Sequence, residues 1–248
     1  MFLIGDIGNT EVKIILFNNK KKIIKKIILK TNKISNNYIS NNLKLNQSIQ
    51  NKIKKILFSS VVPSVFSKFR YFFKKKYKKN CYELKNLKLA KILKINVNRR
   101  QVGSDRLANA LAVLNQKDNF IIVDFGTATT FDVVVKDTYL GGVIAPGVNL
   151  SLKTLSSKAK LIPKIKLSKN NKVIGKNTVS AVRSGFYWGY AGLIENIIKL
   201  ISKQSKRSYK IIFTGGYSDL FQNSISIKSL IKKDLTIYGL LRIIKYIK

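Results

Sequence analysis

Asp124 and the residues after it form the group in this sequence best suited to bind a phosphorylated ligand. The stretch from Phe120 to Val135 reads FIIVDFGTATTFDVVV, in which two apolar runs flank a turn of small residues. Gly126 allows a close approach of the backbone, and Thr127 and Thr129 supply hydroxyl groups. Together with the Asp124 carboxylate, they suit a phosphate chain and its counter-cation. An ordinary core hairpin with a polar turn is the alternative interpretation.

The chain begins with a similar pattern. Residues 2–17 read FLIGDIGNTEVKIILF, where Asp6, Gly8 and Thr10 repeat the acid, glycine and threonine of the later stretch. The spacing after the glycine differs by one residue. Two such hairpins in one chain predict a duplicated architecture with a nucleotide held between its halves.

A third candidate group is the segment VGSDRLANA at residues 102–110. Gly103 or Ser104 is expected to cap a helix with Asp105 in its first turn, where a carboxylate suits the positive end of the helix dipole. Asp105 could take a proton from a substrate hydroxyl while Arg106 meets negative charge. A plain capped helix with an acidic first turn is the alternative.

These groups need strands and helices to position them, and the hydrophobic periodicity predicts an α/β alternation. Residues 80–100 are expected to be a connection with little chemistry of its own. Besides the two hairpins, the expected strands are 21–30, 55–62 and 210–214, and the expected helices are 64–76, 150–157, 179–203 and 240–247.

The longest expected helix begins after Thr178, which fits its N-cap. Ala181, Gly185 and Gly189 recur every four residues along it and therefore share one face. Small residues at this spacing permit close helix packing. The sequence leaves open whether the partner is internal or a second copy of the chain.

Length and composition favour two α/β domains, expected at residues 1–114 and 115–248 of the 248-residue chain. The single cysteine, Cys81, excludes an intrachain disulfide framework and a cysteine-based zinc site. The sequence contains neither a signal-peptide pattern nor an apolar run of the roughly 20 residues that span a bilayer. We therefore expect a soluble, cytoplasmic protein without a membrane partner.

The charge is strongly positive, with 48 Lys and Arg residues against 11 Asp and Glu residues and a formal net charge of +37. Such a balance raises nucleic-acid binding as a hypothesis. However, only seven of the basic residues are arginine, the residue on which base and bidentate phosphate recognition depends most. The lysines are widely spread among Ile and Asn, which favours compositional drift over a functional basic surface, so we expect no specific nucleic-acid partner.

Taken together, the motifs resemble the type III pantothenate kinase family. The resemblance spans residues 5–240, essentially the whole chain, and its motifs follow the family's order. They are DIGNT at 6–10, VGSDRLAN at 102–109, VDFGTATT at 123–130, GGVIAPG at 141–147, IGKNT at 174–178 with Ser184 and Gly185, and TGG at 214–216.

The resemblance implies two related actin-like (ribonuclease H-like) domains with ATP between them. It implies ATP-dependent phosphorylation of pantothenate, the first step of coenzyme A biosynthesis, by a homodimer. The implied cofactors are ATP, Mg²⁺ and either K⁺ or NH₄⁺.

The resemblance also implies roles for individual residues. Asp105 would be the general base, and Asp124 would hold the monovalent cation. The substrate pocket would be lined by Gly103, Ser104, Asp105 and Arg106, with Thr178 as a further substrate contact. ATP would be bound by Asp6, Gly8, Asn9, Thr10, Lys13 and Thr127, with Asp6 also positioning magnesium.

Two departures from the family pattern concern the substrate pocket. Asn96 stands near the place where family members often carry a tyrosine, and Ser104 stands where alanine is common. Two other functions are kept as alternatives: an actin-fold kinase that acts on another small hydroxyl compound, and a non-catalytic accessory protein that binds nucleic acid.

Overall fold

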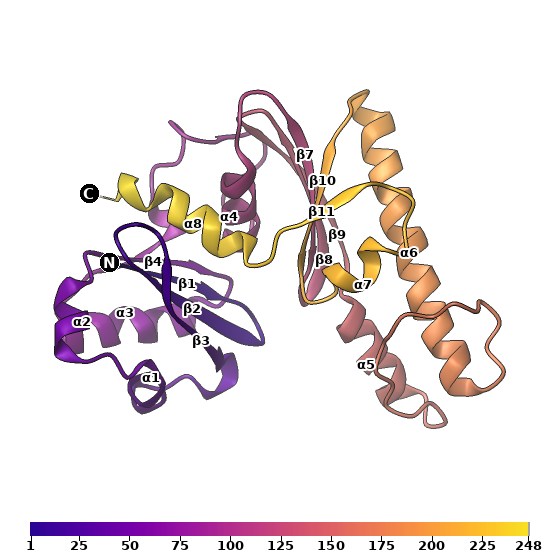
Figure 1. Ribbon diagram of the computed structural model, residues 1–248, viewed down its shortest axis with the longest axis horizontal. Coiled ribbons are helices and arrows are strands. Elements are labelled where there is room, and N and C mark those ends of the chain that lie inside the picture. The colour runs from indigo at the N-terminus through magenta and orange to yellow at the C-terminus, as the bar shows by residue number, and fades with distance from the viewer. Residues whose placement is uncertain (248) are drawn as a thin grey trace. The chain divides into compact units, whose positions relative to one another are not determined.

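The computed structural model describes residues 1–247 (Figure 1). The chain forms two compact units. The first comprises Met1–Leu114 and the segment from Asp234 onward, and the second comprises Asn115–Lys233. Among the described residues, no helix is both long enough and apolar enough to cross a membrane.

The first unit contains a five-stranded sheet with the order β3-β2-β1-β4-β5. Its central strands are apolar and buried, with Leu3, Ile4 and Leu57 fully inaccessible to solvent. β1 pairs with β2 in antiparallel register and with β4 in parallel register. The strands are β1 (Phe2–Ile7), β2 (Glu11–Phe17), β3 (Ile23–Lys30), β4 (Lys55–Ser60) and β5 (Cys81–Glu83).

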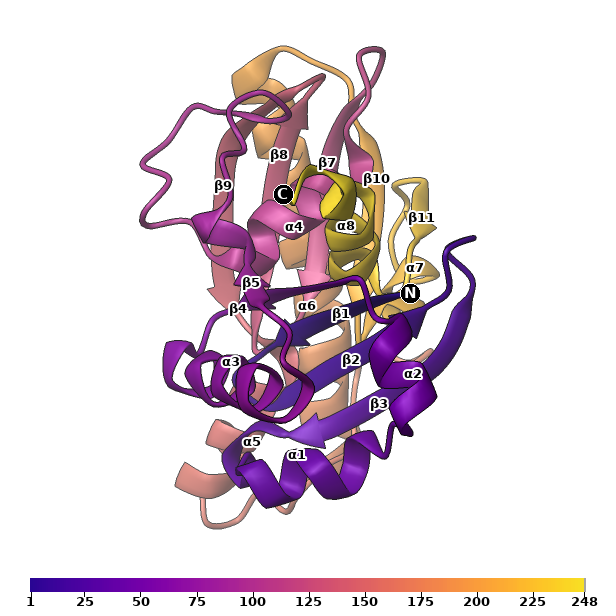
Figure 2. The same ribbon diagram turned by 90° about the vertical axis from the view of Figure 1, so that its left-hand side faces the viewer.

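Helices cover both faces of this sheet. Figure 1 shows α1 and α3 on one side and α4 and α8 on the other, and Figure 2 shows the same layers from the side. As expected from the spacing of the apolar residues in α3, Phe69, Phe72 and Phe73 are buried. The helices are α1 (Asn36–Leu43), α2 (Gln47–Lys52), α3 (Pro63–Tyr77), α4 (Ser104–Val113) and α8 (Leu235–Ile243). The shorter elements are η1 (Thr31–Lys33), η2 (Leu84–Asn86), β6 (Lys94–Ile95) and η3 (Ile244–Tyr246).

The C-terminal helix α8 packs in the first unit, whereas the sequence placed residues 234–248 with the second domain. The reason is a close contact with α4: a Cβ atom added at Gly239 would lie 1.8 Å from the carbonyl oxygen of Ala108. In addition, Thr236 Oγ1 donates a 2.9 Å hydrogen bond to Asn109 Oδ1. The segment therefore returns to the first unit because its small residue permits helix contact.

The second unit is built on a sheet in which β11, β10, β7, β8 and β9 follow one another. β7 and β8 form the antiparallel hairpin expected from the sequence, and β10 pairs with β7 in parallel register. The strands are β7 (Asn119–Phe125), β8 (Ala128–Val135), β9 (Thr138–Pro146), β10 (Lys210–Gly215) and β11 (Ser229–Ile231).

Helices α5, α6 and α7 lie on one side of the second sheet (Figure 1). Buried residues of α6, including Tyr187, Ile194 and Ile198, pack in one core with apolar residues of β7 and β10. The bounds are α5 (Val148–Lys158), α6 (Thr178–Ser205) and α7 (Ser218–Gln222).

Both expected hairpins are confirmed, and several element boundaries are corrected. The N-cap of α6 is Asn177 rather than Thr178. The Asn177 side chain accepts a hydrogen bond from the backbone N–H of Ser180, and the Ser180 hydroxyl accepts one from the backbone N–H of Asn177. This reciprocal arrangement is a capping box. The closing helix begins at Leu235, five residues before the expected Leu240.

Candidate active site

The β1–β2 turn, at residues 8–10, is held by hydrogen bonds from a neighbouring segment. Gly8 N–H donates to the carbonyl of Glu11 at 2.9 Å, which closes the turn. Thr31 Oγ1 donates to the carbonyl of Gly8 at 2.8 Å, and Thr31 N–H donates to the carbonyl of Thr10 at 3.0 Å. Asn9 and Thr10 are exposed. Their polar groups are therefore accessible to a ligand while the backbone is held in place.

Lys13 lies opposite Asp6 in the β1–β2 register, so both side chains occupy the same hairpin. Its ammonium forms a 2.5 Å ion pair with Asp234 Oδ1, and Lys26 binds the other oxygen of that carboxylate at 2.7 Å. Burial opposes ionisation of Asp234, but the hydrogen bonds from the two lysines lower its pKa overall. The sequence analysis did not single out Asp234. The only signal available was the scarcity of acidic residues.

Asp124 lies near the end of β7, against the glycine that ends β10. A Cβ atom at Gly215 would lie 2.7 Å from Asp124 Oδ1 and 2.6 Å from the carbonyl oxygen of Phe125. Gly215 also has a positive φ of 86°, a conformation that favours glycine. Because Gly215 has no side chain, Asp124 Oδ1 and the Phe125 carbonyl oxygen can both lie close to it. We call this arrangement the Gly215 cradle.

The turn between β7 and β8 is packed against the N-terminus of α5. A Cβ atom at Gly147, the N-cap of α5, would lie 2.0 Å from the carbonyl oxygen of Thr127 and 3.0 Å from that of Gly126. Thr127 itself is exposed. The glycine-rich segment at 141–147 thus supplies the surface on which the Thr127 backbone rests.

Asp105 lies in the first turn of α4, whose N-cap is Gly103. The carboxylate folds back over the helix start: Oδ1 accepts a 2.8 Å hydrogen bond from Arg106 N–H and would lie 2.4 Å from a Cβ atom at Gly103. Burial raises the pKa of Asp105, and the Arg106 hydrogen bond and charge oppose that shift only in part. A carboxylate whose pKa is raised in this way is a stronger base once it is ionised.

The segment at 80–100, expected to carry little chemistry, contains a buried carboxylate. Glu83 is 8% exposed, and its Oε1 accepts a 2.6 Å hydrogen bond from Ser104 Oγ, which is 1% exposed. Burial raises the pKa of Glu83. No sequence motif marks this residue, because its partner lies 21 positions away.

Thr178, the other expected substrate contact, is exposed at the first residue of α6. In the first unit, the structure brings Asp6, Gly8, Asn9, Thr10 and Lys13 together on one hairpin. Gly103, Ser104, Asp105 and Arg106 are together at the start of α4.

The oxygen donors beside Asp124 fit a hard cation, since carboxylate and carbonyl oxygens are the ligands such ions prefer. The cradle that a Cβ at Gly215 would fill is the structural observation behind this fit. No cluster of three or more His, Cys, Asp or Glu side chains suited to a metal occurs among residues 1–247. A cation would therefore need ligands other than a protein carboxylate cluster, such as phosphate oxygens.

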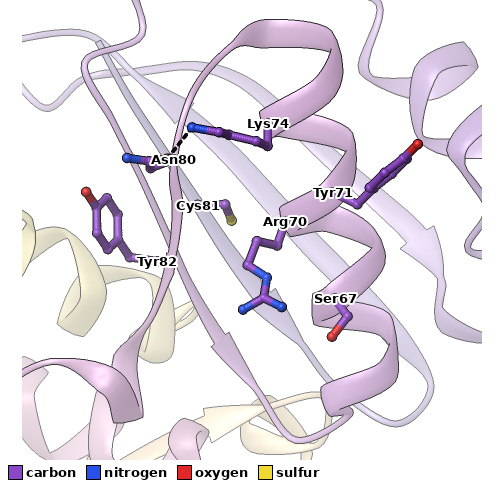
Figure 3. A pocket seen from close by; sticks show the side chains of 7 residues that line it. All are labelled: Ser67, Arg70, Tyr71, Lys74, Asn80, Cys81 and Tyr82. Atoms are coloured by element: carbon purple, nitrogen blue, oxygen red, sulfur yellow. Dashed lines mark hydrogen bonds between the residues drawn. The ribbon is translucent and has the colours of Figure 1, made fainter.

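A separate hollow of about 440 Å³ lies beside α3 and β5 (Figure 3). Arg70 and Lys74 extend from α3 toward the strand that carries Cys81, and Lys74 Nζ donates to Asn80 Oδ1 at 3.3 Å. The residues that line this hollow include neither a carboxylate nor any of the expected site residues. Burial raises the pKa of the Cys81 thiol, so the sulfur stays protonated and is a poor nucleophile. This hollow lacks a general base.

Comparison with known proteins agrees with the motifs. The sequence profile described as type III pantothenate kinase matches residues 2–200. The chain belongs to this family. A type III pantothenate kinase from Pelagibacter ubique (strain HTCC1062) is 59% identical over 249 residues, and the alignment covers 100% of both chains.

Solved structures show that this family member has the actin-like fold of sugar kinases. A Sinorhizobium meliloti protein assigned as a 2-dehydro-3-deoxygalactonokinase superposes with a TM-score of 0.61 at 10% identity, covering 100% of this chain and 99% of the other. A Campylobacter jejuni protein assigned to the Baf family of transcriptional activators superposes with a TM-score of 0.62 at 21% identity, covering 98% of each chain. At these identities the likeness concerns the fold alone.

Proposed function

We propose that the chain transfers the γ-phosphoryl group of ATP to the primary hydroxyl of pantothenate, forming 4′-phosphopantothenate in the first step of coenzyme A biosynthesis. The observation that carries the proposal is the 59% identity to a type III pantothenate kinase across the full length of both chains. The half-buried carboxylate of Asp105 at a helix start supports it, because the reaction needs a base beside the hydroxyl.

In this proposal Asp105 is the general base, and Gly103, Ser104 and Arg106 line the substrate pocket with it. As the pantothenate oxygen bonds to the γ-phosphorus, its proton passes to Asp105 and the bond from the phosphorus to the β,γ-bridging oxygen of ATP breaks. ADP leaves with that electron pair. Phosphoryl transfer depends mainly on alignment and charge neutralisation. The base therefore needs only to lie within hydrogen-bonding distance of the pantothenate hydroxyl.

ATP is bound in this proposal by backbone and side-chain groups of Gly8, Asn9, Thr10 and Lys13 in the first unit and by Thr127 in the second. The exposed polar groups of the β1–β2 turn and the Lys13 ammonium supply hydrogen bonds and positive charge. Placement of the nucleotide between two domains remains a prediction.

The proposed cations are Mg²⁺, positioned with the help of Asp6, and K⁺ or NH₄⁺, held by Asp124. When bound, they offset negative charge on the phosphate oxygens. Asp124 contributes a carboxylate oxygen next to the Phe125 carbonyl, as the Gly215 cradle indicates. Asp6 contributes a carboxylate on the hairpin that carries Lys13.

A homodimer formed through α6 is part of the proposal. A groove of about 390 Å³, lined by Gly185, Gly189 and apolar side chains such as Leu193, runs between α5 and α6. A Cβ atom at either glycine would meet nothing within 4 Å, so the face is open to a second copy of the helix. Thr178 begins the same helix, and we propose that it contacts substrate near this interface. We also propose a cytoplasmic location, with neither a membrane nor a specific nucleic acid as partner.

The test is ATP consumption by the purified protein with pantothenate and Mg²⁺, in K⁺ and in Na⁺. We expect turnover that requires pantothenate and rises with K⁺, and we expect Asp105→Asn to remove most of it while ATP binding remains. Turnover with a different hydroxyl compound and none with pantothenate would show that the other compound is the substrate. A folded protein without ATP turnover that retains DNA at moderate salt would favour the accessory role.

A further inference from the structure

Glu83 is the central acceptor of a buried hydrogen-bond network that joins three elements of the first unit. Its Oε1 accepts from Ser104 Oγ at 2.6 Å, and its Oε2 accepts from the backbone N–H of Lys85 at 2.7 Å. The backbone of Ser60, the last residue of β4, also donates to this carboxylate. One side chain therefore connects β4, η2 and the first residue of α4.

The network lies next to the groups proposed for catalysis. Ser104 immediately precedes Asp105, and Ser60 follows Ser59, which is opposite Asp6 in the parallel β1–β4 register. Gly103, the N-cap of α4, has no side chain to cap the helix. The Ser104–Glu83 hydrogen bond thus fixes a helix start that lacks a side-chain cap.

The loop before α4 is also hydrogen-bonded to residues of η2 and the residue that follows it. Arg99 Nη2 donates to the carbonyls of Lys85 and Leu87 at 2.8 and 2.6 Å, and Lys85 Nζ donates to the carbonyl of Arg100 at 3.2 Å. The η2 turn consequently holds the chain both before and at the beginning of α4.

We propose that Glu83 is a positioning residue for phosphoryl transfer: by holding Ser104 against the end of β4, it sets where the Asp105 carboxylate lies relative to the carboxyl ends of β1 and β4. The proposal rests on Asp105 being the base in the proposed function. An ionised carboxylate suits the site because each of its known partners is a donor, and a glutamine would turn an amide N–H₂ toward one of them.

The test compares Glu83→Gln with the wild-type protein in steady-state kinetics. We expect kcat to fall about tenfold, because a misplaced reacting group is costly even at small displacements. KM for ATP should stay within about twofold, since the β1–β2 turn is held by other contacts. Ser104→Ala should lower kcat less, and adding it to Glu83→Gln should change little further, because both remove the same hydrogen bond.

Glu195→Gln is the matched control. Glu195 also accepts hydrogen bonds from a serine hydroxyl and the same serine's backbone N–H, those of Ser226, but it lies in the second unit. We expect its kcat to equal that of the wild-type protein.

The pH profile separates positioning from a loss of folded protein. Burial raises the pKa of Asp105 against the charges of Arg106 and Lys85, both of which Glu83→Gln retains. A loosened helix start admits water to Asp105, so the acidic limb of kcat/KM should move to lower pH, by about half a unit. A smaller fraction of folded enzyme would lower the rate without moving this limb.

The outcomes distinguish this inference from the function on which it depends. An unchanged kcat and pH limb in both Glu83→Gln and Ser104→Ala, with Asp105→Asn inactive, would overturn the role of Glu83 alone. Wild-type turnover in Asp105→Asn would instead overturn the assignment of the base. If Glu83→Gln does not fold, the acidic limb of kcat/KM in Ser104→Ala decides the matter: a loosened helix start moves this limb to lower pH, whereas loss of a substrate contact at Ser104 leaves it in place.

Discussion

The two hairpin turns have similar sequences but are held by different forces. The β1–β2 turn is held by polar contacts: the Thr31 hydroxyl on the carbonyl of Gly8, and Asp234 on Lys13. The β7–β8 turn is held by close backbone packing, with Gly147 directly against the carbonyl of Thr127. The first arrangement responds to charge and hydrogen bonding, whereas the second responds to volume.

This difference teaches that a repeated motif need not be supported in a repeated way. Polar anchors allow the first turn and Lys13 to exchange hydrogen-bond partners, as the proposed binding of ATP phosphates requires. Backbone packing leaves the second turn little freedom, because protein interiors accept little extra volume. Substitutions chosen for charge or for volume should therefore affect the two turns differently.

The largest effect is expected for Gly147→Ala, which adds a Cβ atom 2.0 Å from the Thr127 carbonyl oxygen. The turn must move, so we expect turnover to fall about 100-fold and the free energy of unfolding to fall by roughly 1–3 kcal/mol. Gly192→Ala is the control, since a Cβ there meets nothing within 4 Å. Wild-type kinetics in Gly147→Ala would show that this packing does not set the position of Thr127.

A smaller effect is expected for Lys13→Met, which removes the charge proposed to face the ATP phosphates. KM for ATP should rise about tenfold, the equivalent of one charge-assisted hydrogen bond. Lys26→Met is a matched control, because Lys26 binds the same Asp234 carboxylate and is not among the proposed ATP ligands. Equal changes in KM for the two variants would assign the effect to Asp234 instead.

Thr31→Val should act on the first turn alone. It removes the hydrogen bond that the Thr31 hydroxyl donates to the Gly8 carbonyl. We therefore expect the free energy of unfolding to fall by about 1 kcal/mol. KM for ATP should rise a few-fold. Thr31→Ser keeps the hydroxyl and should restore both values; failure to do so would point to the lost methyl group.

The smallest effect is expected for Asp234→Asn. The pKa of Asp234 is lowered in the folded protein, so its ionisation stabilises the fold above the ordinary Asp value and that stability is lost as the pH falls through the folded value. The side chain is partly exposed, so the loss at pH 7 should be at most about 1 kcal/mol. Denaturant unfolding should show the difference from wild type at pH 7 and none in strong acid. A difference that persists there would have another cause.

The sequence alone predicted both hairpins, the start of α4 at the GSDR segment and the family to which the chain belongs. These features are local: alternating apolar residues, small residues in a turn and a capped helix determine structure over a few positions. The same local reasoning misplaced the N-cap of α6 by one residue. Thr178 and Asn177 are both good capping residues, and the capping box with Ser180 decided between them.

Only the tertiary structure showed what supports the site. Glu83 reaches Ser104, Asp234 reaches Lys13, Gly147 meets Thr127 and α8 returns to α4 across 20 to more than 200 positions of sequence. No periodicity or motif encodes such pairs, because each depends on where separate elements meet after folding. The sequence thus determined which residues could carry the chemistry, and long-range packing decided which others hold them in place.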